Sequence, residues 1–86
     1  MSETWELVLH RNAARTFFNC RGTERRRLEQ AFDSLATDPN QRYASDVKDA
    51  SGRPNRVLEC GRWSIVYWLD AFVKEVRIVS LERDPR

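Results

Sequence analysis

The stretch from Arg56 to Leu81 constrains the fold more than any other part of the chain. It contains three apolar runs rich in β-branched and aromatic residues, which are separated by Gly61-Arg62 and by Asp70-Ala71. Connections this short are typical of hairpin turns between antiparallel strands. The stretch therefore predicts a three-stranded meander.

The middle run has the pattern of a strand that is covered on both sides. Side chains alternate along a strand, and here both sets are largely apolar: Trp63, Ile65, Tyr67 and Leu69 on one face, and Ser64, Val66 and Trp68 on the other. This run is therefore predicted to be the central strand. The sheet needs a cover on one face, and the first half of the chain offers two helical patterns for it.

The chain begins with a predicted strand and a short predicted helix. Residues 4–10 alternate apolar and polar side chains, as in a half-buried strand. Asn12 is a suitable N-cap for a helix that runs to about Cys20. That helix is expected to bury one of its two alanines and two phenylalanines, namely Ala13 or Ala14, Phe17 and Phe18.

A second helix follows directly. Gly22 suits the left-handed conformation that ends many helices, and Thr23 is the next candidate cap. An apolar stripe at i, i+3, i+4 and i+7 predicts an amphipathic helix, and it consists of Leu28, Ala31, Phe32 and Leu35. Pro39 disfavours helical geometry at the residue before it, so this helix is expected to end near Ala36 or Thr37.

Residues 40–55 have little periodicity, and we predict an irregular loop there. The order of elements is then strand, helix, helix, loop and three strands. This order predicts an α+β domain, β-α-α-β-β-β, with a small antiparallel sheet of about four strands and an N-terminal helical hairpin packed on one face. Residues 1–86 are expected to form one domain, because a chain of this length has room for a single core.

Composition excludes several classes of protein. The chain is 41% hydrophobic and 33% charged, with no apolar run long enough for a membrane span and no pattern of a signal peptide. Cys20 and Cys60 lack metal-ligand spacing, and we expect two reduced thiols in a cytoplasmic protein. No motif calls for a cofactor or a metal ion.

The cations are unusual in kind and in position. Of the 15 basic residues only Lys48 and Lys74 are lysines, and the net charge is +2. Between Arg11 and Arg27 six arginines accompany one acid, Glu24. Two interpretations stay open: a solvated helix face, or a surface for nucleic acid or an acidic partner, since guanidinium groups match phosphate and carboxylate.

Three short motifs occur in a familiar order. They are Leu-x-x-Asp-Pro at Leu35 to Pro39, Gly-x-aromatic-x-Ile-Val-Tyr at Gly61 to Tyr67, and Val-Ser-Leu-Glu-Arg at Val79 to Arg83. Together with the order of strands and helices, they make the chain resemble the RelE/ParE toxin superfamily over nearly its whole length. The resemblance implies the toxin of a type II toxin–antitoxin pair. RelE-like members cut messenger RNA in the ribosomal A site, ParE-like members poison DNA gyrase, and an antitoxin segment wraps the toxin and holds it inactive.

Metal-independent RNA cleavage needs a base for the 2′-hydroxyl proton, cations for the charge on the phosphate, and an acid for the leaving oxygen. In RelE-like nucleases the position after the aromatic residue of the glycine motif is usually an arginine that grips the phosphate, and here it is Ser64. Arg83 matches the terminal arginine of the family and is the candidate for phosphate contact, the alternative being an ion pair with Glu82 or Asp84. Glu59 is the candidate base, the alternative being a cross-strand ion pair with Arg77.

Further candidates are contacts to RNA. Arg56 and Arg62 flank the second strand of the meander, and Arg53 lies in the loop before it. Each of them is an ordinary surface charge under the alternative interpretation. Trp68 can stack on a base, hold an antitoxin helix or belong to the core.

Three functional hypotheses follow from the resemblance. The first is a toxin that inhibits translation by ribosome-dependent cleavage of mRNA, the second is a ParE-like inhibitor of DNA gyrase, and the third is a non-catalytic member that binds an antitoxin. In all three we expect an antitoxin partner. A sheet whose two faces are both apolar, with helices on only one, is expected to leave an apolar groove for it.

Overall fold

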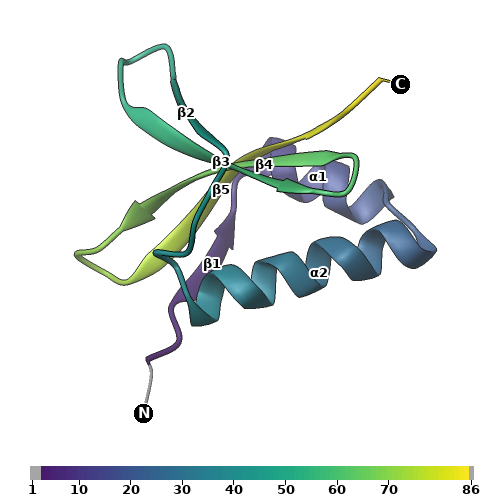
Figure 1. Cartoon of the computed structure of the whole chain (residues 1–86), viewed down its shortest axis with the longest axis horizontal. Coiled ribbons are helices and arrows are strands. Elements are labelled where there is room, and N and C mark those ends of the chain that lie inside the picture. The colour runs from purple at the N-terminus through teal and green to yellow at the C-terminus, as the bar shows by residue number, and fades with distance from the viewer. Residues whose placement is uncertain (1–2, 86) are drawn as a thin grey trace.

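The computed structural model of the chain describes residues 3–85. Five strands form one sheet in the order β1-β5-β4-β3-β2 (Figure 1). The bounds are Glu6–Leu9 for β1, Ser45–Lys48 for β2, Pro54–Cys60 for β3, Trp63–Asp70 for β4 and Glu75–Arg83 for β5. The α+β class is confirmed, but the expected count of about four strands is one too low. The sheet is also mixed, because β1 pairs with β5 in parallel and all other pairs are antiparallel.

The predicted meander is confirmed as β3, β4 and β5, with β4 at the centre of the sheet. Its alternation also holds. Ile65 and Tyr67 are completely buried and face the helices, while Val66 is buried on the opposite face. The register between β4 and β5 shifts after Val66, whose partner is Ser80, because Tyr67 then pairs with Ile78. Val79 is therefore an extra residue in β5, as in a β-bulge.

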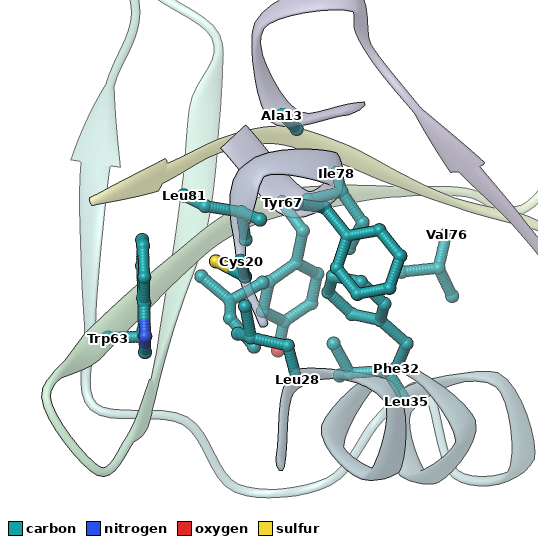
Figure 2. Close-up of a cluster of buried hydrophobic side chains, with 12 residues drawn as sticks. Ala13, Cys20, Leu28, Phe32, Leu35, Trp63, Tyr67, Val76, Ile78 and Leu81 are labelled. Carbon is teal, nitrogen blue, oxygen red and sulfur yellow. The ribbon is translucent and has the colours of Figure 1, made fainter. Parts of the chain in front are cut away.

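Two helices cover one face of the sheet (Figure 1). They are α1, Arg11–Asn19, and α2, Gly22–Thr37. The predicted stripe of α2 is confirmed, because Leu28, Phe32 and Leu35 are buried. In Figure 2 these side chains surround Tyr67 together with Ile78 and Val76 of β5.

The predicted helix starts are each corrected by two residues. The residue before α1 is His10, and Asn12 lies inside the helix; Arg21 precedes α2, and Thr23 lies inside it. Among residues 3–85, no side chain forms a capping hydrogen bond at either N-terminus. Phe18, expected in the core, is 64% exposed, because α1 turns only Ala13 and Phe17 fully toward the sheet. Within residues 3–85, neither helix is long and apolar enough to cross a membrane.

The expected irregular loop contains β2, which pairs with β3 in an antiparallel hairpin. All four of its residues, Ser45-Asp46-Val47-Lys48, are exposed. Because neither face of this strand is buried, its sequence does not alternate apolar and polar residues as a half-buried strand does. The hairpin turn is held by Asp49. Its Oδ1 accepts hydrogen bonds from the backbone N–H groups of Ser51 and Arg53, at 3.0 and 2.9 Å, and from the Ser51 hydroxyl at 2.7 Å. These hydrogen bonds lower the pKa of the Asp49 carboxyl.

Replacing Leu28 by alanine tests the contact between α2 and the sheet. Leu28 is 0% exposed, and we expect Leu28→Ala to lower the free energy of unfolding by about 2–5 kcal/mol. Urea titration followed by circular dichroism measures the change. Phe72→Ala is the matched control, because Phe72 is 100% exposed and should change the stability by less than about 0.5 kcal/mol. Equal losses for the two variants would contradict this core.

Candidate functional site

Four arginines from three parts of the chain lie together at one end of the sheet. Arg62 occupies the turn between β3 and β4, and Arg83 ends β5 opposite Trp63. The backbone N–H of Asp84 donates a hydrogen bond of 2.7 Å to the carbonyl of Arg62, which joins the turn to the end of β5. The start of α2 adds two more guanidinium groups. We call this group the arginine end: Arg21, Arg27, Arg62 and Arg83, with Glu24 and Trp63 between them.

Glu24 is the counter-ion at the centre of the arginine end. Its Oε1 lies 2.9 Å from Nη2 of Arg83. Two hollows adjoin it, one of about 50 Å³ toward Arg27 and Arg62 and one of about 290 Å³ toward Arg21 and Arg83, and Glu24 and Trp63 line both. The four guanidinium groups outnumber the carboxylates of Glu24 and Asp84 by two. An anion that enters either hollow therefore meets an excess of positive charge.

Two local features shape these hollows. Gly61 has a φ of 61°, a left-handed conformation that favours glycine. A Cβ at this position would lie 3.3 Å from Nη1 of Arg27, so the missing side chain also leaves room for that guanidinium. The second feature is the indole of Trp63, whose buried Nε1–H has no hydrogen-bond partner among the described residues. In Figure 2 Trp63 stands at the margin of the core, apart from Tyr67 and Phe32.

Cys20 borders the larger hollow but does not have the properties of a nucleophile. Burial raises the pKa of its thiol, and the nearby Glu24 carboxylate raises it further, whereas Arg83 and Arg25 act in the opposite direction with smaller effect. A raised pKa keeps the thiol protonated at neutral pH, and the protonated form is the unreactive one. Within residues 3–85, no three His, Cys, Asp or Glu side chains are grouped so as to hold a metal ion.

The sheet face that the helices leave uncovered carries a further depression, of about 520 Å³. We call it the open-face hollow. Val47, Val57, Val66 and Val79 contribute apolar surface, and Ser45, Lys48, Asp49, Asn55, Glu59, Ser64 and Glu82 contribute polar groups. Ser64, which stands where the resemblance implies an arginine, pairs with Glu59 on one side and with Glu82 on the other. The position therefore lies between two carboxylates.

The two predicted catalytic residues lie on opposite faces of the sheet. Arg83 pairs with Trp63, whose side chain is in the helix-covered core, whereas Glu59 pairs with Ser64 and lines the open-face hollow. The alternative partner expected for Glu59 is also occupied elsewhere. Arg77 pairs with Glu75 at 2.6 Å and with Asp70 at 3.5 Å.

The predicted RNA contacts fall into three separate places. Arg62 is in the arginine end. The guanidinium of Arg53 lies 4.2 Å from the centre of the Trp68 ring, and that of Arg77 lies 5.4 Å from it, so Trp68 forms a cation–π stack with both.

Arg56 is in the third place, where its guanidinium lies 4.8 Å from the Tyr43 ring. Its strand partner is Tyr67, whose pKa is raised by burial, an effect that Arg56 partly offsets. The six predicted residues therefore do not form one site. Arg62 and Arg83 come together in the arginine end, Arg53 and Trp68 come together in a cation–π stack, and Glu59 and Arg56 lie apart from both pairs.

Sequence reasoning missed the contribution of α2 to this site. Arg21, Glu24 and Arg27 belong to the arginine-rich segment between residues 11 and 27, but nothing in the sequence indicated which other part of the chain it approaches. The available signal was the charge imbalance of that segment. Its combination with a terminal Arg83 required the tertiary structure.

No protein-family model matches the sequence, and no curated protein matches it significantly. Solved structures do match. A chain of the archaeal RelE–RelB complex from Pyrococcus horikoshii OT3 has a TM-score of 0.77 at 16% identity, over 96% of this chain and 98% of that chain. A chain of the toxin–antitoxin complex RelBE2 from Mycobacterium tuberculosis has a TM-score of 0.76 at 15% identity, over 96% and 94%. The intact Escherichia coli RelBE complex gives 0.63 at 16% identity, over 95% and 99%.

These matches extend over nearly the whole of each chain. The protein therefore has the RelE fold, and the resemblance inferred from the three sequence motifs is confirmed at the level of the fold.

Arg83→Ala should leave the protein folded. The side chains of Arg83 and Glu24 are 50% and 40% exposed, and an ion pair this accessible to water contributes less than about 1 kcal/mol. Thermal unfolding of the variant beside Arg42→Ala, an exposed arginine in the segment before β2, measures the difference. A loss of more than about 2 kcal/mol for Arg83→Ala alone would make Arg83 a structural residue.

The two thiols should differ in reactivity. In a Cys60→Ser variant, Cys20 is the one remaining thiol, and its burial and raised pKa predict slow reaction with a disulfide reagent at neutral pH. The matched Cys20→Ser variant reports on Cys60, which is partly exposed and should react faster. Comparable rates in the two folded variants would show that Cys20 is accessible.

Proposed function

We propose that this protein is the toxin of a type II toxin–antitoxin pair and that it inhibits translation by ribosome-dependent cleavage of mRNA in the cytoplasm. The observation that carries the proposal is the arginine end on a RelE fold, where Arg62 and Arg83 lie with Arg21 and Arg27 around a single glutamate. Residues 1–86 act as a single toxin domain in this proposal. The fold alone supports many activities, so the arginine end is what points to RNA.

The arginine end suits the part of the reaction that involves the phosphate. Guanidinium groups bind phosphate oxygens in pairs and stabilise the negative charge that builds up during cleavage. Arg83 and Arg62 take this role in the proposal. The Glu24 carboxylate occupies Arg83 in the free protein, so RNA binding exchanges one anionic partner of Arg83 for another.

Glu59 is proposed as the base, with a geometric condition. It lies on the other face of the sheet, but it is adjacent along β3 to Cys60, whose partner is Trp63 opposite Arg83. The reacting nucleotide therefore has to pass over the end of the sheet to meet both residues. Arg53 and Trp68 lie elsewhere and are proposed to contact RNA outside the reacting nucleotide, where a stacked indole and guanidinium can hold a base. Arg56 remains a proposed contact of the same kind.

We propose an antitoxin as the protein partner. The matched structures are described as RelE–RelB and RelBE toxin–antitoxin complexes. The open-face hollow supports this, because it has apolar surface that neither helix covers. Val47 at its side is 43% exposed. A bound segment of a second protein removes such surface from water.

A second candidate function is inhibition of DNA gyrase. It is favoured by Ser64, which lies between Glu59 and Glu82 in place of the arginine that the resemblance implies. Two carboxylates there repel a phosphate. A gyrase inhibitor does not need RNA-cleaving residues, and neither does a member that only binds an antitoxin.

Induction of the chain alone in a bacterium tests the proposal. We expect growth arrest with new cuts in translated messages, detected by primer extension, and loss of both in Arg83→Ala. Arg42→Ala is the matched control and should arrest growth like the unchanged protein, because Arg42 is exposed and lies outside the arginine end. Immunoblotting of the soluble fraction shows that each variant accumulates.

Each of the other outcomes would support one of the alternative functions. Arrest without cuts, together with gyrase trapped on DNA, would replace RNA cleavage by gyrase inhibition. Normal growth of cells that contain soluble protein would contradict toxicity and leave a module that binds an antitoxin.

A further inference from the structure

The open-face hollow is acidic although the protein as a whole is basic. Its charged residues are Lys48 against Asp49, Glu59 and Glu82, which gives 1 − 3 = −2, whereas the whole chain carries +2. Within the described residues, Glu59 has no ion pair within 4.0 Å. Within the same part of the chain, Glu82 accepts a hydrogen bond of 3.3 Å from the Ser80 hydroxyl and forms no ion pair. The two glutamates are therefore available to a cation from outside.

Asn55 adds a buried acceptor to the same hollow. The residue is 2% exposed, and its Oδ1 has no hydrogen-bond partner within the described part of the chain. A buried carbonyl without a donor costs free energy. A ligand that brings an N–H group to Asn55 removes that cost.

The apolar residues determine what kind of cation fits. Val57 and Val66 pair with each other across β3 and β4, and Val79 and Val47 flank them in the same hollow. A free metal ion or a small hydrated cation gains nothing from valine side chains. Lysine and arginine do, because their methylene stems pack on apolar surface while the charged head reaches an acid.

We propose that the open-face hollow binds a segment of the partner protein in which Lys or Arg alternates with apolar residues, its cationic heads at Glu59 and Glu82 and an N–H at Asn55. This rests on the proposed function, since the partner is then the antitoxin. The carboxylates repel phosphates, so a protein segment and not a nucleic-acid strand is the proposed occupant of the hollow as a whole, although a reacting nucleotide can still approach Glu59 from the end of the sheet. The hollow and the arginine end thus have opposite charge and bind partners of opposite charge.

Short synthetic peptides with blocked ends test the proposal. One alternates valine and arginine, and its control alternates valine and glutamate. Each is titrated into the full chain while NMR follows the Val57 and Val66 methyl groups and the Asn55 side-chain amide. We expect only the arginine peptide to shift these signals. Removing both carboxylates by Glu59→Gln with Glu82→Gln should weaken its binding by about tenfold or more, as expected for the loss of paired charges.

Glu29→Gln is the matched control, since Glu29 is exposed on α2 and pairs with Arg25. This variant should bind the arginine peptide as tightly as the unchanged protein does. Both glutamates of the hollow are exposed, so the double variant should fold, and its NMR spectrum verifies this. A rising salt concentration should weaken the binding of the arginine peptide. The proposal would be overturned if the glutamate peptide bound equally well, or if the arginine peptide bound the double variant without loss. It would also be overturned if the same signals shifted when the protein alone was concentrated, because the occupant would then be a second copy of the chain.

The peptide titration is independent of toxicity. A chain that does not arrest growth can still bind the arginine peptide. That result would support the proposed binding site in the open-face hollow and contradict the proposed toxin activity. Arrest and message cuts with no peptide binding would do the reverse.

Discussion

The packing of α2 on the centre of the sheet is the contact on which the rest of this structure depends. Leu28 and Leu35 are completely buried against Ile65, Tyr67 and Ile78. A chain of 86 residues has apolar surface for one core of this kind and little in reserve. Because α2 is fixed there, its first turn is brought to the end of the sheet, where Glu24 meets Arg83. The site is therefore a consequence of how the core packs.

The same packing separates charge between the two faces. Across β3, β4 and β5, Cys60, Trp63 and Arg83 are paired neighbours, and Arg83 belongs to the helix-covered side. The adjacent set of paired residues is Glu59, Ser64 and Glu82, and its two carboxylates lie on the open side. Alternation along a strand makes this possible, because adjacent residues point to opposite faces. Positive and negative surfaces can thus be only one residue apart along the chain while they face different partners.

Much of the fold could be predicted from local patterns. The meander followed from three apolar runs with short turns, and the stripe of α2 from its period, because both elements bury one regular face. β2 was missed because it is an exposed edge strand that has no buried face to give it a period. The parallel pairing of β1 with β5 was missed because it joins residues about 70 positions apart, as in Glu6 with Glu75, and short strands do not encode their neighbours.

The candidate site was harder to predict than the fold. Arg83 and Arg62 were proposed from the sequence because they lie at strand ends in the matching motifs, and in the structure they lie at the same end of the sheet. That Arg83 and Glu59 lie on opposite faces of the sheet could not be predicted, since a residue's face depends on the register of the whole strand and on the extra residue at Val79. The contribution of α2 depended on tertiary packing, which no local pattern contains.

The most direct test of the arginine end is the affinity of purified protein for single-stranded RNA as a function of salt concentration. Each phosphate contact that is lost should reduce the slope of log affinity against log salt by about 0.7. We expect Arg83→Ala to bind more weakly with a slope reduced by about that amount, and Arg62→Ala to behave in the same way. A slope that is unchanged in both variants would show that RNA does not contact the arginine end, and would contradict its role.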